Sequence, residues 1–175
     1  MGVYRDVGHV IARVMSIETI DGTKKAGWQQ RYQSGFPESR QGGEGLSEQE
    51  RLTQDSMTRA ALHRELPELA WQVLVAKYSI NDVEVAKAVH WLVPRVACPA
   101  HHLFRMKCVT AWAIPRRLPE AFYQLQTWDV DGTPESTLRR WRVLTKRWLE
   151  DQVDGAFKAA HPVLAFRGLI EAEAA

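Results

Sequence analysis

The clearest structural signal in this 175-residue chain lies at residues 133–148, which read TPESTLRRWRVLTKRW. Thr133 is a good helix N-cap, and Pro134 suits the first helical position because its missing N–H costs nothing there. Glu135 favours the positive end of the helix dipole. We therefore predict a helix from Glu135 to Gln152, with a buried stripe at helical spacing made by Leu138, Trp141, Leu144 or Thr145, and Trp148.

The other faces of this predicted helix are polar and basic. They carry Ser136, Thr137, Arg139, Arg140, Arg142, Lys146 and Arg147. Short side chains near the start of a helix allow close approach to base edges in the major groove of DNA, where arginine can pair with guanine. Lys146 and Arg147 lie further along the helix and would neutralise phosphates. These residues, together with Thr133, are the candidate DNA-binding residues.

The preceding residues complete a predicted helix-turn-helix over 119–152. A short helix is expected from Pro119 to Trp128, with inward-facing side chains at Ala121, Phe122 and Leu125. Residues 129–132, DVDG, form the turn, in which Gly132 can take a positive φ. This turn is longer and more polar than the usual glycine-centred turn. The geometry of the motif therefore stays open, and a helix-turn-helix variant like that of sigma factors is one of the alternatives.

The rest of the chain also predicts helices. Apolar residues recur at helical spacing over residues 2–17, 47–66, 67–79, 81–94 and 100–112, and no segment alternates like a strand between turn residues. The predicted fold class is all-α, a helical bundle with a C-terminal helix-turn-helix and a flexible N-terminal arm. We divide the chain into residues 1–46, a helix followed by the arm, and residues 47–175, a helical DNA-binding domain.

The N-terminal unit offers two kinds of contact. Its helix has an apolar stripe, expected to dock on the chain's own core rather than on a partner, at Val3, Val7, Val10, Ile11 and Val14. Residues 21–45 are rich in glycine and interleave basic with aromatic residues, namely Lys24, Lys25, Trp28, Arg31, Tyr32 and Phe36. Such an arm can stack on single-stranded nucleic acid or grip a partner, or its aromatic side chains can fold back onto the core.

The net charge of +2 hides an uneven distribution. Residues 85–148 hold eleven bases and four acids, a net charge of +7, which leaves −5 for the rest of the chain. A surface that binds polyanions requires such a basic block, although a solvated face on a basic bundle would have the same composition. No apolar run approaches the roughly 20 residues of a transmembrane helix, and the N-terminus lacks the apolar stretch of a signal peptide. We expect a cytoplasmic protein with no membrane partner.

Motifs for metal binding and catalysis are weak. Zinc-ligand types occur at Cys98, His101, His102 and Cys108, but a helix through this segment would separate the two cysteines. We therefore expect core cysteines with partly exposed histidines. The sequence has no phosphate-binding loop and no nucleophile-elbow motif, so we predict neither an enzyme nor a cofactor, while Asp129 with Asp131 keeps a metal-dependent nuclease open.

Two resemblances sharpen this interpretation. Residues 133–141 resemble the recognition helices of many bacterial and phage regulators, which often read Ser-x-x-Ser-Thr-Val-x-Arg-Trp. The layout of residues 47–152, with LAWQVLVAKY at 69–78 before a helix-turn-helix, is similar to the Q-type transcription antitermination proteins of lambdoid phages and to the related AlpA lysis activator of Pseudomonas.

The likeness to the antitermination family implies a mechanism. Such a protein binds double-stranded DNA beside a promoter, loads onto RNA polymerase with its sigma factor, and promotes read-through of terminators. The arm at residues 24–36 would then contact the polymerase or nascent RNA. Three other functions fit the same residues: an ordinary repressor or activator, a phage DNA-packaging recognition subunit, and a protein whose basic block grips an acidic protein instead of DNA.

Overall fold

The computed structural model describes residues 3–17 and 47–170, and all regular elements in these ranges are helices. The predicted all-α fold class is therefore confirmed. The α-helices are α1 (Val7–Met15), α3 (Glu48–Glu65), α4 (Glu68–Tyr78), α5 (Asp82–Leu92), α6 (His102–Ala113) and α7 (Glu135–Phe166). Three 3-10 turns are η1 (Val93–Arg95), η2 (Glu120–Tyr123) and η3 (Leu125–Trp128).

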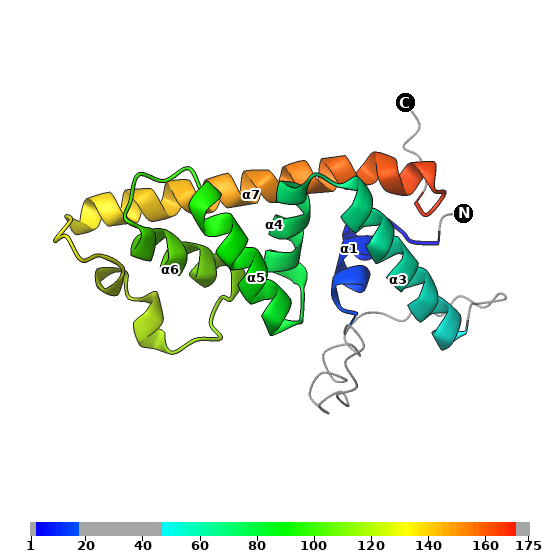
Figure 1. The fold of residues 1–175 in the computed structure, drawn as a ribbon, viewed down its shortest axis with the longest axis horizontal. Coiled ribbons are helices and arrows are strands. Elements are labelled where there is room, and N and C mark those ends of the chain that lie inside the picture. Colours follow the sequence, from blue (N-terminus) through cyan, green and yellow to red (C-terminus); the bar gives the residue numbers. More distant parts are fainter. Residues whose placement is uncertain (1–2, 18–46, 171–175) are drawn as a thin grey trace.

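Helix α7 is the long central element of the fold (Figure 1). It has 32 residues and runs along most of the length of the fold, and α1, α3, α4 and α6 pack against it. The prediction ended this helix at Gln152, which is wrong, because α7 continues past Gly155 and through Pro162 to Phe166. Apolar residues buried along this extension hold it in helical form against the poor helix propensity of glycine and proline.

The larger of two apolar cores forms around α4, most of whose side chains are buried. Helix α1 packs in this core with Val10, Ile11 and Val14 fully buried, which confirms that the N-terminal helix docks on its own chain. The helix begins at Val7 rather than at Gly2, because the Asp6 carboxylate caps it by accepting the N–H of His9 at 2.8 Å.

A buried polar cluster fastens α1 to α3. The Asp55 carboxylate accepts hydrogen bonds from the Tyr4 hydroxyl at 2.6 Å and from Arg13 Nη2 at 2.7 Å. Burial and the hydrogen bond to Asp55 raise the pKa of Tyr4 to about 12. The backbone N–H of Tyr4 also donates to the carbonyl of Leu169 at 2.9 Å, so the start and the end of the described chain meet at this end of the molecule.

Several helix boundaries follow the capping signals of the sequence. Ser47 and Glu50 form the predicted capping box at the start of α3. Asn81 caps α5, as expected, by accepting the backbone N–H groups of Val83 and Glu84. These caps set the register in which the apolar faces of α3 and α5 reach the core.

A second, smaller core lies at the other end of α7. It contains buried side chains from α6, η3 and the start of α7, with η2 packed against its edge. The predicted short α-helix over 119–128 is wrong, because this segment forms the two 3-10 turns η2 and η3. Leu125 is buried as expected, Phe122 is half-buried, and Ala121 is exposed instead of facing inward.

Some predictions concern parts of the chain that the structure leaves undescribed. The basic and aromatic arm at residues 24–36 lies outside the described residues. Within residues 3–17 and 47–170, none of the helices combines the length and apolar character that crossing a membrane demands.

Candidate nucleic-acid interface

The start of α7 rests on an aromatic platform built by α6 and η3. Phe104 of α6 makes edge contacts with Trp128 and Trp141, with ring centroids 5.6 and 5.8 Å apart. Leu138, one turn into α7, is buried in the same cluster. Because large aromatic side chains bury much surface and pack in defined orientations, this platform fixes the direction in which α7 projects.

Hydrogen bonds hold the two 3-10 turns to each other and to the region of α6. Trp128 Nε1 donates to the carbonyl of Phe122 at 2.6 Å, and Lys107 Nζ donates to the carbonyl of Thr127 at 2.7 Å. The Tyr123 hydroxyl donates to the carbonyl of Ile114 at 2.5 Å. The irregular segment before α7 is thus anchored at several points, although it is not the α-helix that the sequence predicted.

The loop that leads into α7 is held by hydrogen bonds to the side chain of Asp129. Its carboxylate accepts the backbone N–H of Thr133 at 2.6 Å and the Thr133 hydroxyl at 3.1 Å. These hydrogen bonds, the backbone one first, hold the pKa of Asp129 below its usual value. Thr133 is therefore not the N-cap that was predicted; Pro134 takes that position, without a side-chain hydrogen bond to the helix.

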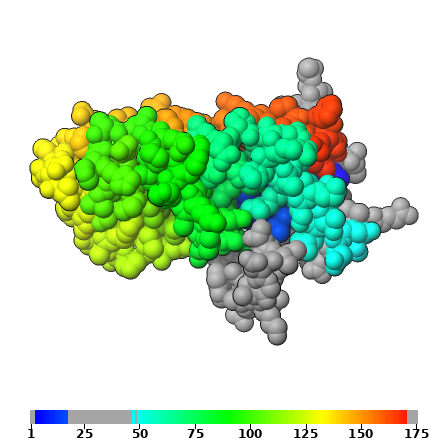
Figure 2. Space-filling model, viewed as in Figure 1, coloured from blue at the N-terminus to red at the C-terminus, as the bar shows by residue number. Residues whose placement is uncertain are grey.

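Gly132 takes the conformation that the sequence predicted for it. Its φ is +71°, in the left-handed region that glycine enters without the penalty of a Cβ atom. With this turn, the loop reverses the chain at one end of the molecule, where the start of α7 reaches the surface (Figure 2).

The buried side of α7 follows the predicted stripe with one correction. Leu138 and Thr145 are buried, and Trp141 and Trp148 are half-buried. Of the two alternatives at the middle position, Thr145 is correct and Leu144 is wrong, since Leu144 is 53% exposed. The fully buried Thr145 and Leu149 continue the line that Leu138 begins.

Most of the candidate DNA-binding residues lie on the opposite, solvent-facing side of α7. The exposed ones are Ser136, Arg139, Arg140, Lys146 and Arg147, and the half-buried ones are Thr133, Thr137 and Arg142. Helical spacing places Ser136, Arg140 and Arg147 along one outward stripe. The structure thus brings four exposed cationic side chains together on about three turns of one supported helix.

One of these cations is paired in the protein itself. Arg139 donates to Glu135 Oε1 through Nε at 3.0 Å and through Nη2 at 2.6 Å. Both side chains are half exposed or more, so the pair is screened by water and contributes about 0–1 kcal/mol. The four-residue spacing of Glu135 and Arg139 was visible in the sequence, but the sequence reasoning did not use it.

The positive face of α7 ends abruptly. Glu150, Asp151 and Asp154 follow Arg147, and all three are exposed. Glu150 is engaged, since it accepts the indole N–H of Trp112 at 2.9 Å and pairs with Lys77. This reversal of charge ends the run of exposed cations within the first half of α7.

Two apolar residues on the exposed side of α7 were missed by the sequence analysis. Val143 and Leu144 are 60% and 53% exposed, next to the cationic side chains. The helical period places Val143 on the side opposite the predicted stripe, but its exposure was not used, and Leu144 was one of the two alternatives for the stripe. Their exposure gives the positive surface an apolar centre.

The cysteine and histidine cluster does not assemble. Cys108 is buried in the smaller core, where burial raises the pKa of its thiol to about 12, and Cys98 is half-buried. His101 and His102 are exposed, and His101 caps α6 by accepting the N–H of Leu103. Among the described residues, no group of three or more histidine, cysteine or acidic side chains is arranged to hold a metal ion.

Comparison of the chain with protein-family models, with curated proteins and with solved structures finds no match.

Proposed function

We propose that this protein binds duplex DNA, with the first half of α7 lying in the major groove. The observation that supports the proposal most directly is the exposure of Arg139, Arg140, Lys146 and Arg147 on one helix at an end of the molecule. A major groove admits a single α-helix, and the dense negative charge of DNA favours such a surface.

The support behind the helix strengthens this interpretation. A reading helix must hold its side chains in a fixed register, and the aromatic platform with its anchored 3-10 turns supplies that rigidity. The platform differs from a pair of α-helices joined by a tight turn. The proposal therefore concerns α7 presented on a support made by α6 and η3, as a variant of the predicted helix-turn-helix.

The test is selection of bound sequences from random duplex DNA, followed by binding measurements on variants. Arg140→Ala should weaken binding to the selected site by about 1–3 kcal/mol if the side chain reaches a base. Lys146→Ala should weaken all sequences alike and reduce the salt slope by about one. Lys158→Ala is the matched control, because Lys158 is exposed on α7 beyond the acidic residues.

Binding that is unchanged in both Arg140→Ala and Lys146→Ala would refute the placement of DNA on α7. Binding with no dependence on salt would refute a phosphate contact altogether. The third outcome of interest is loss of binding in Lys158→Ala, which would move the DNA surface to the other half of the helix.

The finer proposal is that this DNA binding serves transcription, as the layout resemblance to Q-type antitermination proteins implies. Terminator read-through by purified RNA polymerase, measured with and without the protein, separates this role from that of an ordinary repressor or activator. Particles of ring size in light scattering would instead favour a DNA-packaging subunit.

A further inference from the structure

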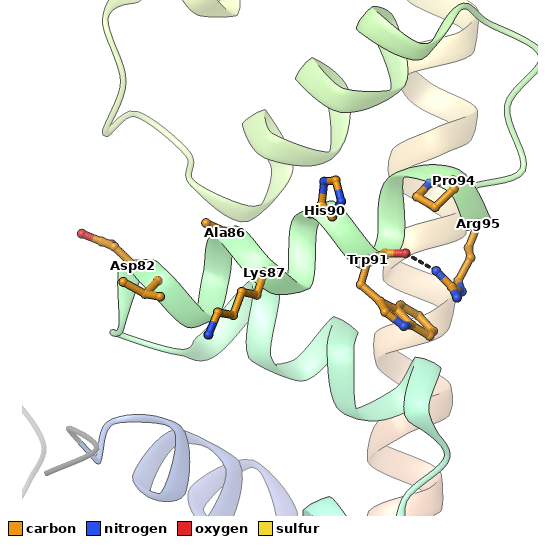
Figure 3. Close-up of a pocket in the computed structure, with 8 residues that line it drawn as sticks. Asp82, Ala86, Lys87, His90, Trp91, Pro94 and Arg95 are labelled. Carbon is orange, nitrogen blue, oxygen red and sulfur yellow. Dashed lines mark hydrogen bonds between the residues drawn. The ribbon is translucent and has the colours of Figure 1, made fainter. Parts of the chain in front are cut away.

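A shallow groove lies on the outer face of α5 and η1, on a different helix from the positive face of α7 (Figure 3). Helix α4 packs against both α5 and α7, whereas α5 and α7 make no contact with each other in the described part of the chain. The groove therefore lies on an element that does not contact the helix of the proposed DNA surface.

The floor of the groove is apolar. Val83, Ala86 and Pro94 are exposed there, and Val83 is 62% exposed despite its hydrophobic side chain. Val83 and Ala86 are three residues apart on one face of α5, and Pro94 follows in η1, so the floor spans about 16 Å along the two elements. Trp91 is half-buried at the end of this floor.

The rim of the groove is basic. The side chains of Lys87 and His90 are exposed and have no hydrogen-bond or ion-pair partner within residues 3–17 and 47–170. Arg95 lies over the indole of Trp91, with its guanidinium carbon 3.6 Å from the ring centroid, and donates to the Trp91 carbonyl at 2.6 Å (Figure 3). The acidic residue of the lining, Asp82, faces Arg117 at 3.5 Å.

We propose that this groove binds an acidic amphipathic helix of a partner protein. Apolar side chains of the partner would cover Val83, Ala86 and Trp91, and its carboxylates would pair with Lys87, His90 and Arg95. Tryptophan and arginine are also the residue types that most often dominate the energy of protein interfaces. The proposal does not depend on DNA binding by α7.

Charge complementarity decides the chemistry of the occupant. A second nucleic-acid strand would find cations on the rim, but protein surfaces that bind nucleic acid are polar, and the floor here offers apolar carbon. A basic or neutral helix would cover the floor and leave the rim cations facing like charge or nothing. An acidic amphipathic helix satisfies both parts of the groove.

The test uses a fluorescein-labelled synthetic peptide of about 18 residues, with leucine at helical spacing on one face and glutamate on its flanks. Fluorescence anisotropy should show binding to the full chain. Lys87→Glu with His90→Glu should weaken this binding by about tenfold, since a cation and an N–H donor that face the peptide carboxylates are both replaced by carboxylates that repel them. Val83→Ser should weaken peptide binding several-fold, because it removes an apolar contact from the floor of the groove.

Two controls keep the result specific. The same peptide with lysine in place of glutamate should bind at least tenfold more weakly to the wild-type chain. Arg51→Glu reverses an exposed charge on α3 and should leave peptide binding unchanged. Helical circular dichroism and duplex DNA binding, measured on each variant, separate a local loss of the groove from a loss of the fold.

Nuclear magnetic resonance locates the contact. The indole N–H signal of Trp91, assigned with Trp91→Phe, should shift on addition of the acidic peptide and stay in place on addition of duplex DNA. The proposal is overturned if DNA rather than peptide shifts this signal, if the lysine peptide binds equally well, or if the protein self-associates through this face.

Discussion

At the scale of single residues, a glutamate of the proposed DNA surface competes with DNA for one of its arginines. Glu135 occupies Arg139 through two hydrogen bonds and also places a negative charge where a phosphate would approach. The same carboxylate stabilises the helix, because it lies in the first turn near the positive end of the dipole. Stability and anion binding therefore make opposite demands on this residue.

Glu135→Gln should consequently separate the two properties. DNA affinity should rise several-fold, because Arg139 is released and a repulsive charge is removed. The free energy of unfolding should fall by roughly 0.3–1 kcal/mol as the dipole interaction is lost. Binding titrations and chemical denaturation of the same preparation check both changes, and a fall in DNA affinity would contradict the model of the surface.

Val143 gives a second prediction at this scale. It lies between Arg140 and Arg147 on the exposed side of α7, where an apolar side chain can contact the methyl group of thymine. Replacing thymine by deoxyuridine in the selected site should weaken binding of the wild-type protein. The same replacement should have no effect on Val143→Ala, and equal losses in both proteins would rule out the contact.

At the scale of elements, the sequence predicted the helices better than their ends. Capping residues such as Ser47 and Asn81 located helix starts, because a side-chain cap is a local signal. The segment before α7 was predicted wrongly, because its 3-10 turns depend on contacts of Trp128 with α6 and of Tyr123 with the residue that follows α6. The local spacing of residues along the sequence does not indicate such tertiary contacts.

The candidate site was predicted to a similar extent. Exposure of Arg139, Arg140 and Arg147 followed from the helical period. The choice between Leu144 and Thr145 did not follow, because hydrophobicity favours leucine while the line through Leu138 and Leu149 runs through the threonine. The actual N-cap also escaped prediction, since Asp129 binds Thr133 and draws it away from the helix.

The hydrogen bonds that Asp129 accepts in the loop predict how stability depends on pH. The pKa of the Asp129 carboxyl in the folded protein lies below the unfolded value of about 3.9, so the stabilising effect of these bonds is complete above that value. The effect is lost as the pH falls through the lowered folded pKa. The backbone N–H signal of Thr133 should titrate with a midpoint below about 3.9, the usual pKa of an aspartate side chain. Asp129→Asn should abolish the titration, and a midpoint above that value would contradict the loop geometry.

At the scale of the whole molecule, α7 connects two cores with separate tasks. The smaller core supports the start of α7, and the larger core joins α1, α3 and α4 to the rest of the helix. The cluster of Tyr4, Arg13 and Asp55 lies with α1 and α3, toward the end of the molecule opposite the proposed DNA surface (Figure 1).

This separation predicts that stability and DNA binding can be changed independently. Asp55→Ala should lower the free energy of unfolding by about 2–3 kcal/mol, less than the roughly 3–5 kcal/mol of a fully buried pair, because Arg13 is 36% exposed. DNA affinity should stay unchanged where the variant is folded. Asp82→Ala breaks an exposed pair and should cost at most about 1 kcal/mol in the same denaturation experiment.

The unbroken length of α7 carries a mechanical consequence. Ala156 and Ala160 are buried against the larger core, and their small side chains set how closely the helix approaches its neighbours. About 30 Å of helix separates Ala156 from the start of α7, so a tilt of about 5° at Ala156 displaces that start by about 2–3 Å relative to the larger core. A bulky side chain at Ala156 would therefore strain the contacts of Leu138 and Trp141 with the smaller core, although it touches neither residue.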